Sequence, residues 1–321
     1  MQTASWSEIE GDLKLGVFLI TVAAQSLLPD YHPAAGPFGK AALGDAFNEG
    51  QLATWQVNDD EDLQSFNVSN TRFYLVARAC YDYVHATTPL DSVDIEYFEA
   101  EHLHWLHYFL HAVPHDEYVT HMGGSSVVFM ERRDKGDEYP VPGLHLSAAA
   151  KANLAKYLQE FPHSLGGDIG FAPFEIAALA GMNIASVRNF VGPDGGKPIR
   201  TIPGEKGRFV YGNSLDTLEW LAGRRKFDAG PLSPQWVVDA GGRSKSLGDA
   251  CAIIGIYAWV NRVTTEMLAE RSGLPAELIR RWTRGEVDSI EPAKPLARAV
   301  GLDPELYHDI VARQFGADPK P

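Results

Sequence analysis

The chain has 321 residues, of which 45% are hydrophobic and 22% charged, as in a globular protein with room for two or three domains of about 100–200 residues. Its formal net charge is −14, but residues 1–160 hold 9 basic against 23 acidic side chains, whereas residues 161–321 hold 19 of each. The acidic excess lies in the first half, so the total charge does not exclude nucleic-acid binding by the second half.

The first half is expected to be an acidic helical domain spanning residues 1–162. The stretch at 115–145 is polar and contains glycine and proline, which favours a loop or a short strand pair. Ser147 is expected to cap the helix that follows. We expect this domain to serve dimerisation, giving a homodimer, or to bind a protein or small-molecule effector. Apolar residues recur at three- and four-residue spacing, as in amphipathic helices, in residues 6–28, 71–86, 92–112 and 147–161.

Neither a membrane span nor a secretion signal is expected. The longest apolar run, residues 15–28, contains Gln25 and is shorter than the roughly 20 residues that a span needs. The residues before it are mostly acidic, unlike those of a signal peptide. Cys80 and Cys251 are too few for a disulfide framework and lack the spacing of metal ligands. We therefore expect a cytoplasmic protein without membrane association.

One stretch has the spacing of metal ligands. Glu101, His104, His107 and His111 would share one face of a helix, and such a set can hold zinc or iron. However, the histidines alternate with aromatic residues, a pattern that is more common in packed cores, and Pro114 is expected to end the helix. We therefore expect no cofactor. An alternative function remains, in which the chain is a metal- or ligand-binding helical protein.

Residues 168–230 are expected to form a compact unit with a helix-turn-helix. Ile176, Leu179 and Ala180 fit one face of a short helix, and Gly181 can adopt the left-handed conformation that ends it. In the second helix, Val187 is expected to point inward. Arginine and asparagine are suited to bidentate contacts with guanine and adenine, and the outer face of this helix would present Ser186, Arg188 and Asn189 to the major groove.

A basic hairpin and a third helix follow in the same unit. The segments KPIRTI and RFVYG flank the turn PGEKG, and a helix is expected from Ser214 to Arg224. This order of elements resembles the winged helix-turn-helix of the MerR/excisionase class over about 55 residues. The alternative is a small α+β domain that binds protein. The resemblance implies that the wing approaches DNA phosphates with Lys197, Arg200, Lys206 and Arg208.

Residues 246–316 are expected to form a C-terminal helical unit. A Gly/Pro/Ser-rich linker at 228–246 is expected to separate it from the compact unit at 168–230. Thr264 opens a helix, Ser272-Gly273-Leu274 supplies a turn, and Pro275 begins the next helix, which Gly285 ends. This segment resembles the helix-turn-helix of Cro and lambda repressor over residues 263–307. The fold expected for the whole chain is therefore mainly α.

The resemblance assigns DNA-contacting roles in the second motif. Ala276, Glu277, Arg280 and Arg281 would face the groove, whereas Thr265 and Arg284 would lie near phosphates. Glu277 departs from the family, which usually has a small polar or amide residue at this position. Its carboxylate would either accept a hydrogen bond from a cytosine amino group or repel the DNA backbone. The module would then read a narrow set of sequences or bind protein instead.

The expected function is that of a transcriptional regulator that reads double-stranded DNA through both modules. The chain contains no G-x-S-x-G, P-loop, G-x-G-x-x-G or C-x-x-C motif, so we do not expect an enzyme. In the alternative function, that of a metal- or ligand-binding protein, the helix-turn-helix-like units would mediate protein assembly.

Overall fold

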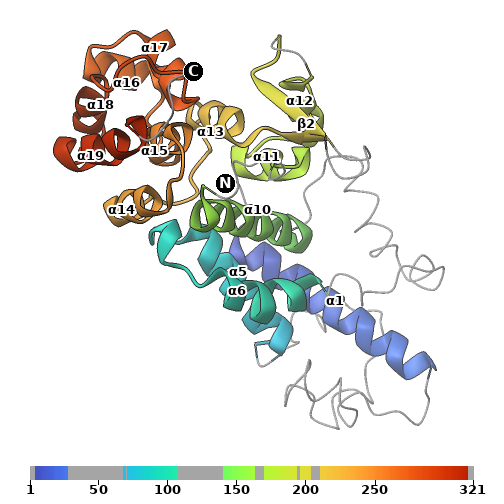
Figure 1. Ribbon diagram of the computed structural model, residues 1–321. Coiled ribbons are helices and arrows are strands. Elements are labelled where there is room, and N and C mark those ends of the chain that lie inside the picture. Colours follow the sequence, from blue (N-terminus) through green and yellow to red (C-terminus); the bar gives the residue numbers. More distant parts are fainter. Residues whose placement is uncertain are drawn as a thin grey trace. The chain divides into compact units, whose positions relative to one another are not determined.

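The computed structural model describes residues 4–27, 68–69, 71–107, 140–162, 170–193, 196–203 and 210–316 (Figure 1). These residues are mainly helical, which confirms the predicted fold class. Among them, no helix combines the length and apolarity that crossing a membrane requires. The chain divides into two compact units, which we call the N-terminal unit (residues 2–85 and 94–149) and the C-terminal unit (residues 86–93 and 150–321).

The N-terminal unit contains two long helices that match the prediction, α1 (Trp6–Leu27) and α5 (Arg72–His85). Over the expected helix at 92–112, the structure is helical from residue 95 to residue 107: α6 (Ile95–Phe98) is followed by a π-helical turn, η3 (Glu99–Leu103), and by α-helical residues 104–107. The Asp94 side chain caps α6 by accepting a hydrogen bond from the amide of Tyr97 at 3.0 Å. The remainder of the expected helix beyond residue 107 lies outside the described residues.

Helix α10 (Pro140–Glu160) begins seven residues before the predicted start at Ser147. Proline is favoured in the first turn of a helix, because the amide that it lacks has no partner there. Ser147 is instead a buried residue within the helix, so its predicted capping role is wrong. Residues 140–149 belong to the N-terminal unit and residues 150–160 to the C-terminal unit.

In the C-terminal unit, the elements from α11 to α13 form what we call the first module. Helix α11 (Pro173–Ala180) ends at Gly181, whose φ of 60° places it in the left-handed region, as predicted. The Asn183 side chain then caps α12 (Ile184–Arg188) by accepting from the amide of Ser186 at 2.7 Å. Buried Ile176, Leu179 and Val187 hold the two helices together.

A small sheet follows α12 in the first module. The predicted hairpin is confirmed, because β2 (Ile199–Pro203) pairs antiparallel with β3 (Val210–Gly212). A short strand that was not predicted, β1 (Val191–Gly192), pairs parallel with β2, giving the order β1-β2-β3. Helix α13 (Ser214–Ala222) completes the module and buries Leu218 and Leu221.

The second module consists of α16 (Thr265–Ser272), α17 (Ala276–Thr283), α18 (Ala293–Ala299) and α19 (Pro304–Phe315). Its turn is formed as predicted, with Gly273 at a φ of 72°, and Gly285 follows α17 at a φ of 77°. The Ile279 and Trp282 side chains of α17 are buried, also as predicted.

The expected linker at 228–246 is wrong, because most of it is a packed helix, α14 (Pro234–Arg243). Ser233 caps this helix and Pro234 occupies its first position, so residues that read as loop-forming instead mark a helix start. The Trp236 side chain is 2% exposed, and its Nε1 donates to the carbonyl of Leu158 at 2.8 Å. The short η2 (Leu90–Ser92) belongs to the same unit.

Helix α15 (Leu247–Val260) is the centre of the C-terminal unit. Every residue from Ala250 to Val260 is buried, and α15 contacts α13, α14, α16, α17 and α19 (Figure 1). Gly255 allows α17 to approach closely, because a Cβ at this position would lie 2.6 Å from Cγ2 of Thr283. Since α13 and α17 pack on the same helix, the two modules share a core.

Candidate nucleic-acid interface

The end of α12 presents the residues that the sequence assigned to base contacts. Arg188 is the last residue of the helix and Asn189 is its C-cap, and both side chains are exposed. Ser186, one turn earlier, is half-buried, so it offers less surface to a partner. The structure therefore brings a guanidinium and a carboxamide together at one exposed helix end.

Lys197 lies against the same helix end. Its Nζ donates a hydrogen bond to the carbonyl of Asn189, which has no partner within the helix. Its aliphatic part passes close to Gly192, where a Cβ would lie 2.7 Å from Cγ of Lys197. Three of the predicted contact residues, Arg188, Asn189 and Lys197, are thus neighbours.

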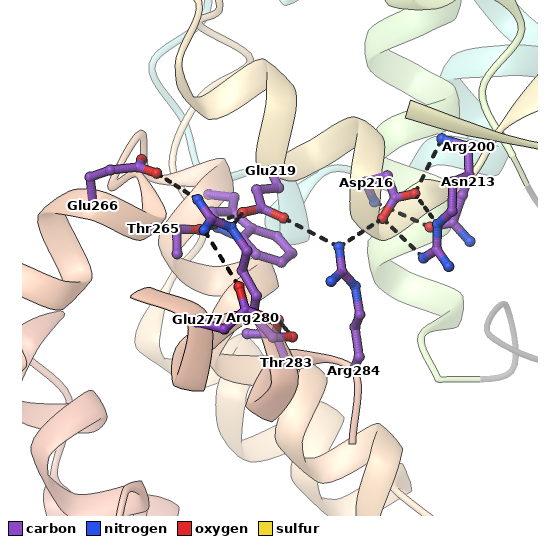
Figure 2. Close-up of polar contacts among 11 residues, drawn as sticks. Arg200, Asn213, Asp216, Glu219, Thr265, Glu266, Glu277, Arg280, Thr283 and Arg284 are labelled. Carbon is purple, nitrogen blue, oxygen red and sulfur yellow. Dashed lines mark hydrogen bonds and ion pairs between the residues drawn. The ribbon is translucent and has the colours of Figure 1, made fainter. Parts of the chain in front are cut away.

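The side chain of Arg200 on β2 points toward the carboxylate of Asp216 (Figure 2). Its Nε lies 2.6 Å from Oδ2 of Asp216 on α13, and its Nη2 lies 3.1 Å from Oδ1. The same carboxylate also accepts from the main-chain amide of Arg200 at 3.2 Å. Hydrogen bonding to Asp216 raises the pKa of Arg200. This ion pair fixes β2 to α13, and the phosphate contact of Arg200, whose side chain is 49% exposed, stays a prediction.

The other two predicted wing residues, Lys206 and Arg208, lie outside the described residues.

In the second module, Arg280 of α17 is held by two carboxylates. Its Nε lies 3.0 Å from Oε1 of Glu219 on α13, and its Nη2 lies 2.7 Å from Oε1 of Glu266 on α16 (Figure 2). The predicted groove contact would require these pairs to open. Arg280, which was predicted to contact bases, therefore connects α17 to α13 of the first module and to α16.

Arg284 is similarly engaged. Its Nη2 lies 3.4 Å from Oδ1 of Asp216 and 3.9 Å from Oε2 of Glu219. Together with Arg200 and Arg280 it alternates with carboxylates in the order Arg200, Asp216, Arg284, Glu219, Arg280, Glu266. We call this set of six residues the charge chain. Since three positive side chains meet three negative ones, the charge chain adds no net positive charge to attract phosphates.

The remaining predicted residues of the second module differ in how exposed they are. Thr265 is 1% exposed, and its hydroxyl donates to Oε1 of Glu219 at 2.9 Å, so its assignment to a phosphate contact is corrected. Ala276 is half-buried at the start of α17, and Glu277 is exposed at 4.0 Å from Arg280. Arg281 is also exposed, but its guanidinium lies 3.3 Å from Asp288.

Basic residues that were not predicted to contact DNA also lie around α11 and α12. The guanidinium of Arg224 stacks 4.2 Å from the ring centre of Trp220 and 5.4 Å from that of Phe190, which follows Asn189. The side chain of Lys226 lies beside the turn, because a Cβ on Gly181 would be 2.8 Å from Cδ of Lys226. The run of three basic residues at 224–226 was the available signal in the sequence.

The metal-ligand hypothesis gains no support in the N-terminal unit. Glu101 lies 2.7 Å from the guanidinium of Arg72 and belongs to η3, where the π-helical geometry breaks the three- and four-residue spacing assumed for a regular helix. His104 and His107 are exposed, and His111 lies outside the described residues. Across the described part of the chain, no three His, Cys, Asp or Glu side chains are grouped so as to hold a metal ion.

Comparison of the chain with models of protein families, with curated proteins and with solved structures gives no significant match.

Proposed function

We propose that the chain binds double-stranded DNA through the first module, with α12 as the helix that enters the major groove. Arg188 would contact guanine and Asn189 adenine, because these side chains can form paired hydrogen bonds with the major-groove edges of those bases. Lys197, which is hydrogen bonded at the same helix end, would approach the phosphate backbone.

The observation that supports this assignment best is the contrast between Arg188 and Arg280. Arg188 is exposed and forms no ion pair with any residue that the structure describes. Arg280 is bound by Glu219 and Glu266 at 3.0 and 2.7 Å. A guanidinium without an internal carboxylate can bind a base edge without first losing an ion pair, so the first module is the better DNA reader.

In this proposal the chain is a cytoplasmic transcriptional regulator that acts as a homodimer. A single helix-turn-helix reads few base pairs, and two copies related by a twofold axis would read two half-sites. The acidic first half, with 9 basic against 23 acidic side chains over residues 1–160, suits dimerisation or an effector better than it suits DNA.

A second candidate function concerns the second module alone. Because Arg280 and Arg284 are bound to α13 and Thr265 is buried, this module is better suited to protein assembly than to base reading. We propose that it stabilises the first module by packing with it on α15.

The test is in vitro selection of binding sites from a random duplex library with the full chain, followed by fluorescence anisotropy on the selected duplex. Arg188→Ala should lose preference for one base by about 1–3 kcal/mol. A matched control is Arg298→Ala on α18, which removes the same charge from another exposed position. If wild-type protein selects no sequence, or if Arg188→Ala selects the same sequence with the same affinity, the proposal is wrong.

A further inference from the structure

We infer that Arg224, Arg225, Lys226 and Arg262 form a surface beside α12 that binds the phosphate groups of the same DNA duplex. We call these four residues the basic strip. The inference rests on the proposed function, because it assumes that α12 is the helix that enters the groove. The inference adds the residues that bind the DNA backbone beside α12.

The basic strip adjoins the helix-turn-helix at both ends of α12. Arg224 stacks on Phe190, which directly follows the exposed Asn189. The aliphatic part of Lys226 lies at Gly181, the turn that precedes α12. A backbone that passed alongside α12 in the major groove would therefore meet basic side chains next to the start and next to the end of the helix.

Arg262, in the connection between α15 and α16, extends the basic strip. Its Nη2 donates to the carbonyl of Arg225 at 3.4 Å, so the side chain lies against the run at 224–226 although it follows α15 in the chain. Arg262 has a φ of 62°, a backbone conformation that a residue with a Cβ disfavours. A glycine would fit this backbone more easily than arginine does. The distinctive feature of the position is therefore the guanidinium group that arginine supplies.

The basic strip differs electrostatically from the charge chain. Arg224, Arg225 and Arg262 form no ion pair with any described carboxylate, whereas each arginine of the charge chain pairs with at least one. Residues 181–230 hold 8 basic and 5 acidic side chains, of which the charge chain contains one basic residue, Arg200, and two acidic ones, Asp216 and Glu219. Arg224, Arg225 and Arg262 are therefore available to an anionic partner.

Duplex DNA fits this surface better than an acidic peptide does. A phosphate backbone presents regularly spaced anions, and guanidinium groups bind phosphate oxygens in pairs. Backbone contacts of this kind fix the register of a recognition helix but do not depend on base sequence.

The experiment measures how the affinity of the full chain depends on salt. Anisotropy titrations use two fluorescein-labelled duplexes, one with the selected site and one scrambled, over about 50–200 mM KCl, a range in which phosphate contacts dominate the change. The test variant combines Arg225→Ala with Arg262→Asn, since asparagine tolerates a positive φ. The control combines Arg298→Ala with Arg313→Ala, which removes the same charge from α18 and α19.

The test variant should lower the log–log salt slope by about 2, because each phosphate contact contributes about 0.9. It should weaken binding to both duplexes by the same factor, and the control should behave as wild type. If the test variant unfolds, Arg225→Ala alone should lower the slope by about 1. Arg225→Lys keeps the charge and should restore the wild-type slope.

The outcomes separate this inference from the proposed function. If wild-type protein binds duplex DNA and Arg188→Ala alters its preference, but the slope of the test variant is unchanged, only the basic strip is wrong. If wild-type protein binds neither duplex, or binds a single-stranded RNA or an acidic peptide in their place, the basic strip and the proposed function are both wrong.

Discussion

Arg284 of the second module reaches Asp216 of the first, with its Nη2 3.4 Å from Oδ1 of a carboxylate that is only 2% exposed (Figure 2). Arg200 binds the same carboxylate from β2 at 2.6 Å. Asp216 therefore binds both the start of β2 and the end of α17. Because it is the most buried member of the charge chain, it is the place where a single substitution should disturb both modules.

We expect Asp216→Asn to destabilise the C-terminal unit. An asparagine has the shape of aspartate but only one acceptor oxygen and no charge, so both guanidinium groups lose an ionic hydrogen bond. Since hydrogen bonds to charged groups contribute about 1.5–3 kcal/mol, and both arginines can regain water, the expected loss is about 2 kcal/mol in the free energy of unfolding. Urea denaturation followed by tryptophan fluorescence measures it.

The matched control is Glu277→Gln, whose side chain is 76% exposed and lies 4.0 Å from Arg280. An exposed pair at this distance contributes little, so its effect should stay within about 0.5 kcal/mol. Equal losses in Asp216→Asn and Glu277→Gln would contradict the role given to the buried carboxylate.

The sequence predicted the local features of this region but not the charge chain. Gly181 and Gly273 indicated helix ends because glycine favours positive φ, and both adopt it. The apolar spacing likewise identified Ile279 and Trp282 as buried. The partner of Arg284 could not be found in this way, because Asp216 lies 68 residues earlier and meets it only after both modules pack on α15.

Helix α14 shows why composition misled the linker prediction. Gly241 and Gly242 suggested a flexible segment, yet one of them has a packing role. A Cβ on Gly241 would lie 2.5 Å from Cδ1 of Ile310 on α19, whereas nothing lies within 4 Å of the corresponding position at Gly242. Periodicity within a short segment cannot distinguish a glycine that permits close packing from one that loosens a chain.

Alanine substitutions at these two neighbouring glycines should change the free energy of unfolding in opposite directions. Gly241→Ala should lower the free energy of unfolding by about 1–3 kcal/mol, since the added methyl group overlaps Ile310. Gly242→Ala should raise it by about 0.5–1 kcal/mol, because alanine favours the helix and meets no other atom there. Thermal unfolding of the two variants compares them directly, and equal effects would contradict the packing of α14 on α19.

Arg262 should show a conflict between stability and DNA affinity. Arg262→Gly is expected to stabilise the protein by about 1 kcal/mol, because glycine adopts the φ of 62° without a steric penalty. The same change removes one member of the basic strip, so the affinity for any duplex should fall. Arg298→Gly is the control, since glycine within α18 should destabilise the protein by about 1 kcal/mol. Urea denaturation and anisotropy on the same samples test the stability and the affinity, and a destabilised Arg262→Gly would contradict the strain argument.

Arg280→Ala tests the division of roles between the two modules. The substitution removes the nearer of the two arginines that pair with Glu219, whose side chain is 20% exposed, so we expect a loss of about 1–2 kcal/mol in the free energy of unfolding. The base preference should be unchanged, because Arg280 contacts carboxylates and not DNA. Measurement therefore needs both denaturation and site selection, with Arg188→Ala expected to give the reverse result: wild-type stability and altered preference.

Arg280→Lys should recover part of the stability through the Glu219 pair, although lysine cannot also bridge to Glu266 as a planar guanidinium does. A change in base preference in Arg280→Ala at wild-type stability would mean that the charge chain opens on DNA and that α17 reads bases after all.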